Sequence, residues 1–84
     1  MNQPDWNHRL SRAVVPIRGN PILKLADARA FILALPSGLR HQDDWQHTAE
    51  LLIVAAESGG VIDIEQATFQ LERTLLFHKL LTGR

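Results

Sequence analysis

The sequence predicts an α+β fold in which a short N-terminal β-hairpin packs on three helices, the last two being the longest. Three observations support this prediction: an apolar run with strand-like alternation, a Gly-Asn-Pro turn after it, and three later segments with apolar residues at helical spacing. The alternative is an all-α fold in which residues 12–25 are extended but unpaired.

The hairpin is expected over residues 13–25. Ala13, Val15 and Ile17 would share one face of the first strand, because side chains on a strand alternate with a period of two. Pro16 cannot donate a hydrogen bond to a neighbouring strand, so this strand should lie at an edge. A two-stranded hairpin is marginal in water, so it must pack its apolar face on helices.

Two helices are expected in the middle of the chain. The first spans residues 27–35 and ends before Pro36, because the residue before a proline avoids the helical region. After a loop over residues 37–42, the second spans residues 45–58 and stops at Gly59-Gly60. Its core-facing stripe should contain Trp45, Ala49, Leu52, Ala55 and Ala56.

The last helix is expected over residues 63–81 and has two apolar faces. One face holds Ile64, Ala67, Leu71 and Leu75, which suits packing on the core. A chain of 84 residues has little left to cover a second face: either the hairpin and the first helix bury it, or a partner does. Exposed apolar patches usually mark interfaces, so we expect a homodimer or another protein partner to contact this face through Phe69, Leu76, Phe77 and Leu80.

The length of the chain suits one domain. We expect residues 1–11 to form a loose leader, with Trp6 docked back on the domain, and residues 12–84 to form a single α+β domain. Charge divides unevenly: residues 1–42 carry six basic and two acidic side chains, and residues 43–84 carry three basic and seven acidic ones. Complementary halves that pack on each other are the simplest interpretation.

The chain contains no cysteine, which excludes disulfides and cysteine-based metal or nucleophilic sites. Small secreted domains usually need disulfides, so this composition favours a reducing, cytoplasmic setting. The first ten residues are polar and lack the apolar stretch of a secretion signal. The longest apolar run, residues 51–56, is far shorter than the roughly 20 residues of a membrane span. No membrane contact is expected.

The histidines and carboxylates do not form a convincing metal or catalytic site. His41 and His47 flank Asp43 and Asp44, but two imidazoles at this spacing do not share one helical face, and the aspartates suit helix capping. His78 is expected to be a partly buried, hydrogen-bonded imidazole near a helix end. No serine has a neighbouring base motif and no glycine-rich phosphate loop follows a strand, so no catalytic residue, metal or cofactor is predicted.

Nucleic-acid binding through the basic N-terminal half is an alternative. Its candidate patch is Arg9, Arg12 and Arg18. The spacing from Ala55 to Gly59 is that of a helix-turn-helix, but polar residues stand where the following helix should bury apolar ones. Acidic side chains there would also repel phosphates.

The layout of the chain resembles a family of small proteins of unknown function found in rhizobia and their relatives. The resemblance covers residues 12 to about 80: a short strand, a turn and second strand, a helix ending at Leu35-Pro36, a Trp- and Ala-containing helix, and a last helix opening Gln66-Ala67-Thr68-Phe69. It implies the order of hairpin and helices and a bacterial cytoplasmic setting. It implies no activity, cofactor or site.

The functional hypothesis rests on the second apolar face of the last helix. We expect a small, non-catalytic protein-interaction or regulatory module that is homodimeric through this helix. A nucleic-acid-binding accessory protein is one alternative. A small ligand-binding protein or enzyme is another, although the sequence alone does not locate a pocket for it.

Overall fold

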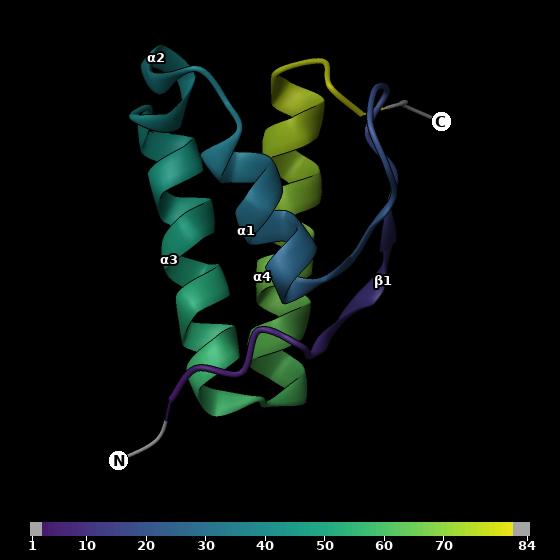
Figure 1. Ribbon diagram of the computed structural model, residues 1–84, viewed down its shortest axis with the longest axis vertical. Helices are drawn as coiled ribbons and strands as arrows, with labels where there is room; N and C mark the ends of the chain where they lie inside the picture. Colours follow the sequence, from purple (N-terminus) through teal and green to yellow (C-terminus); the bar gives the residue numbers. More distant parts are fainter. Residues whose placement is uncertain (1–2, 82–84) are drawn as a thin grey trace.

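The computed structural model describes residues 3–81, and within this range the chain is α+β, as predicted. Strands β1 and β2 pair antiparallel, so the all-α alternative is wrong. Figure 1 shows α3 and α4 side by side, with α1 crossing in front of them and β1 running along the other side of α4. The elements in chain order are β1 (Arg9–Val14), β2 (Ile22–Lys24), α1 (Leu25–Leu33), α2 (Ser37–Arg40), α3 (Asp43–Ser58) and α4 (Val61–Phe77).

The first strand begins four residues earlier than predicted and buries the opposite face. Leu10 and Val14 point into the core, whereas Val15 and Ile17 are exposed. The predicted register was off by one residue because Leu10, assigned to the leader, was not counted with the strand. A shift of one residue exchanges the two faces of a strand.

The N-terminal segment is joined to the helices by backbone hydrogen bonds. The Asp5 amide donates to the Ala56 carbonyl at 2.8 Å, and the Ala26 amide donates to the Trp6 carbonyl at 2.8 Å. Trp6 packs against the core, as predicted. The boundary predicted at residue 12 falls inside β1, so residues 9–11 belong to the hairpin and the description of residues 3–11 as loose needs correction.

Helix α1 starts directly after β2, with Asp27 near its start as predicted. One Asp27 oxygen accepts hydrogen bonds from the Leu23 and Lys24 amides, which anchors the end of the hairpin to the first turn of the helix. The segment predicted as the loop 37–42 contains the short helix α2. The prediction therefore lacked one helical turn but had the correct order of the longer elements.

Helices α3 and α4 form an antiparallel pair that supplies most of the core. Four of the five residues predicted for the α3 stripe are buried, and Ala49 is partly buried. The turn between the helices depends on Gly59, whose φ of 65° is unfavourable for residues with a side chain. A Cβ added at Gly59 would also lie 2.8 Å from Nε2 of His8, so the N-terminal segment packs closely on this turn.

Helix α4 starts two residues earlier and ends four residues earlier than predicted. Lys79 has a φ of 60°, which turns the chain away from the helix axis. The Ile17 amide then donates to the Leu80 carbonyl at 2.7 Å, and Pro16 and Leu81 form an antiparallel bridge. The residues after α4 therefore return to the hairpin instead of continuing the helix.

Truncation of a core leucine on α4 should destabilise the protein strongly. Leu71 is fully buried, so Leu71→Ala should lower the free energy of unfolding by about 2–5 kcal/mol. Leu33→Ala, at an exposed leucine of α1, is the matched control and should cost less than about 1 kcal/mol. Urea unfolding followed by circular dichroism measures both, and equal losses would contradict this assignment of the core.

Candidate functional site

The outer face of α4 carries a stripe of exposed apolar side chains. Ile62, Phe69 and Leu76 are seven residues apart, so they lie along nearly one line on the helix, which drifts by only about 20° per seven residues. Their exposed fractions are 72%, 51% and 48%. The buried α4 residues lie on the opposite side of the helix: Ala67, Thr68, Leu71, Thr74 and Leu75. We call the exposed residues Ile62, Phe69, Leu76 and Phe77 the α4 surface.

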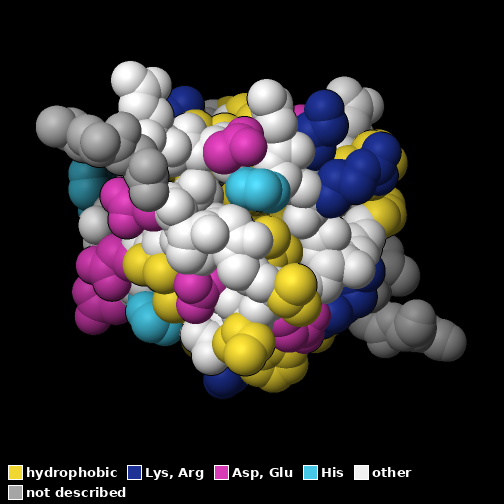
Figure 2. Space-filling model, turned by 90° about the horizontal axis from the view of Figure 1, so that it is seen from below, with side chains coloured by type: hydrophobic (Ala, Val, Ile, Leu, Met, Phe, Trp, Pro, Cys, Tyr) yellow, Lys and Arg dark blue, Asp and Glu magenta, His cyan; other side chains and the backbone are white. Residues whose placement is uncertain are grey.

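Polar and aromatic groups border this stripe. Phe77 is 78% exposed beside the end of the stripe. The Arg73 guanidinium carbon lies 5.8 Å from the centre of the Phe69 ring, close enough for a cation–π contact. Figure 2 looks onto the end of the molecule that carries the α3–α4 turn, and apolar side chains gather along the lower edge of this view. Val61 and Ile62, at the start of α4, are strongly exposed.

Three of the four predicted interface residues lie on the α4 surface. Phe69, Leu76 and Phe77 are exposed, so within residues 3–81 neither the hairpin nor α1 buries them. Leu80 differs, because the helix ends before it and its side chain packs partly against the core. Ile62 was not among the predicted residues because the helix was predicted to start at Asp63. The seven-residue spacing of Ile62, Phe69 and Leu76 was the signal that could have found it.

Arg12 joins the hairpin to α4 beside the stripe. Its guanidinium donates to both carboxylate oxygens of Glu72, at 2.6 and 2.9 Å, and to Glu65 at 3.0 Å. These hydrogen bonds raise the pKa of Arg12 further above its ordinary value. Hydrogen bonding from Ser11 and from Arg12 holds the pKa of Glu65 below its usual range. The basic N-terminal half and the acidic C-terminal half thus pair directly here.

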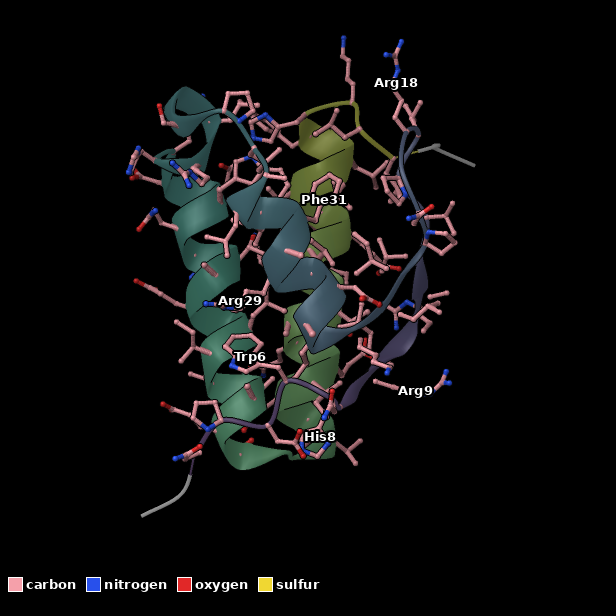
Figure 3. The ribbon with its side chains drawn as sticks, viewed as in Figure 1. Trp6, His8, Arg9, Arg18, Arg29 and Phe31 are labelled. Carbon is pink, nitrogen blue, oxygen red and sulfur yellow. The ribbon has the colours of Figure 1, made fainter. Side chains whose placement is uncertain are left out.

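The three arginines proposed as a basic patch do not form one surface. Arg12 is engaged by two glutamates. In Figure 3, Arg9 lies at the start of β1, whereas Arg18 lies at the far end of the hairpin. A surface that binds nucleic acid needs its cations gathered along one face, so this geometry gives no support to the nucleic-acid alternative.

His78, directly after α4, contacts the first turn of α3. Its Nε2 lies 2.8 Å from an Asp44 carboxylate oxygen, and its ring stacks on Trp45 with centroids 5.5 Å apart. The prediction of a partly buried, hydrogen-bonded imidazole is confirmed. Asp43 or Asp44 was predicted as the N-cap of α3, but the cap position is Gln42. The Asp44 side chain contacts His78 instead.

The polar groups between α3 and α4 have structural roles. The Thr48 and Thr74 hydroxyls are 2.9 Å apart in the buried contact, and Gln70 donates to Thr74. Ser58 donates to Asp63 at 2.6 Å and accepts from the Gly60 amide, which ties the α3–α4 turn. Within residues 3–81, no three histidine or acidic side chains are placed to hold a metal ion together. None of the helices in this range is long and apolar enough to cross a membrane.

Comparisons with known proteins identify no family for this chain. The chain matches no protein-family model, no curated protein and no solved structure at a significant level. The resemblance to small rhizobial proteins therefore stays a prediction. The function has to be inferred from the surfaces of the molecule itself.

Removing the Arg12 guanidinium should destabilise the protein more at neutral pH than in acid. After Ser11, Arg12 is the second cause of the lowered pKa of Glu65, so the stabilisation from the Arg12–Glu65 contact is present above the ordinary glutamate pKa and is lost as the pH falls below it. Arg12→Gln should therefore lower the urea midpoint at neutral pH, and the difference from the wild type should shrink at a pH of about 3. Arg9→Gln is the control. A deficit of equal size at both pH values would contradict the ionic account.

Proposed function

We propose that this protein is a small, non-catalytic interaction module that associates with a second copy of itself through the α4 surface. The observation that supports this most strongly is the straight stripe of Ile62, Phe69 and Leu76, which lies opposite the core side of the same helix. Apolar residues repeated every seven positions are typical of helices that pair along one seam. No covering element from residues 3–81 buries this stripe.

A second copy suits this surface because the stripe is nearly symmetric about its centre. In a two-fold pair with antiparallel α4 helices, Phe69 would meet Phe69 of the other copy, and Ile62 would meet Leu76. An aliphatic side chain would then face an aliphatic one at both ends. Such self-complementarity is what a two-fold interface requires, since the same patch serves both subunits.

The interface should be weak and sensitive to concentration. Helix α4 has 17 residues and is therefore about 25 Å long. One helix face of this length covers less than the roughly 800 Å² that a standard interface buries on each partner. We infer a reversible, regulatory association in the cytoplasm; the cysteine-free composition supports that location.

A charge on the α4 surface should abolish self-association. Leu76→Asp would place a carboxylate in the apolar seam, where its desolvation is costly. By light scattering, the wild type should approach the mass of two chains as concentration rises, whereas Leu76→Asp should keep the mass of one chain.

Leu23→Asp, at an exposed leucine of β2, is the matched control and should associate like the wild type. Circular dichroism would verify that both variants are folded. A wild type with the mass of one chain even at high micromolar concentration would contradict self-association, and equal effects of the two substitutions would contradict the assignment to α4.

A further inference from the structure

A second surface, away from α4, is hollowed between α1 and α3. This groove has a volume of about 420 Å³, which is within the range of small-molecule sites, about 300–1,000 Å³. Ile32 and Leu52 line it and are buried, whereas Leu33 and Ile53 line it and are exposed. Pro4 and Trp6 of the N-terminal segment also line it. We call this hollow the Trp6 groove.

A small residue of α3 lines the groove. Ala49 lies in the groove lining, one helical turn from Ile53. Its side chain is a single methyl group, so space is left between the larger residues of α1 and α3. A larger side chain at this position would extend into the hollow. Because Ala49 is partly buried and packs against the core, circular dichroism has to verify that a variant with a larger side chain there is folded.

One charged side chain lines the groove. The guanidinium carbon of Arg29 lies 5.4 Å from the centre of the Trp6 ring, and Figure 3 shows the two side chains next to each other in front of α3. Within residues 3–81, no carboxylate lies at ion-pair distance from Arg29. The groove thus combines an apolar lining with a cation that contacts an aromatic ring and has no acidic partner.

We propose that the Trp6 groove binds a small amphipathic carboxylate, with its alkyl chain along the groove and its carboxylate on Arg29. Apolar pockets with a few convergent polar groups are the usual form of small-molecule sites. A guanidinium matches the two oxygens of a carboxylate with two parallel hydrogen bonds. The alkyl chain would cover Leu33 and Ile53, which water otherwise contacts. This site is independent of the α4 surface.

Titration with octanoate tests the site, followed by two-dimensional ¹H–¹⁵N spectra of the full chain. We expect saturable shifts at the Trp6 indole and at the amides of Ala49 and Ile53, with none along α4. Acetate tests the alkyl chain and octyltrimethylammonium tests the head group; neither should give these shifts at the same concentrations. Shifts that do not saturate, or that centre on the α4 surface, would overturn the proposal.

Two variants test the two halves of the ligand separately. Arg29→Gln should weaken octanoate binding about fivefold, since an ion pair open to solvent is worth about 1 kcal/mol or less. Ala49→Leu should fill the groove and remove the saturable shifts while Arg29 stays in place. The matched controls are Arg9→Gln and Ala30→Leu, both at exposed positions outside the groove. Octanoate affinity unchanged in both Arg29→Gln and Ala49→Leu would overturn the proposal.

Discussion

The packing of α3 against α4 is the interaction on which the rest of the structure depends. The fully buried Trp45, Leu71 and Leu75 belong to these two helices, and the Thr48 and Thr74 hydroxyls meet at 2.9 Å inside the contact. The close turn at Gly59 holds the pair together. The hairpin and α1 then cover part of the apolar surface that this pair leaves exposed. Within residues 3–81 no element covers the outer side of α4, so the side opposite the core is exposed.

The charge pattern has a structural explanation in this arrangement. The hairpin is basic and the last two helices are acidic, and the two parts meet where Arg12 lies between Glu65 and Glu72. This contact fixes β1 along α4 without using the helix's outer stripe. Arg29 differs from Arg12 because it contacts Trp6 instead of a carboxylate. Arg12 therefore joins the hairpin to α4, whereas Arg29 lines an open groove.

Much of the fold was predictable, because the apolar periodicity of a long helix is visible within one continuous stretch of sequence. Spacing predicted the α3 stripe, the helix stop at Gly59 and the partial burial of His78. It left open whether Phe69, Leu76 and Phe77 are buried by the hairpin and α1 or exposed, as they are. The register of the hairpin could not be predicted, because nothing in the local sequence indicates that Leu10 lies on the same strand face as Val14. The Trp6 groove could not be predicted either, since Pro4, Arg29 and Ala49 are far apart in sequence and come together only in the folded chain. The pairing of Asp44 with His78 is hidden for the same reason.

The central claim is that the outer face of α4 is the surface through which the protein associates with itself. A dilution series of two-dimensional ¹H–¹⁵N spectra, from millimolar to low micromolar wild-type protein, tests it most directly. The account predicts shifts that change with concentration at Ile62, Phe69, Leu76 and Phe77, while the exposed amides of α1 and β2 stay constant. Spectra that do not change with concentration, or changes centred on α1 or the hairpin, would contradict it.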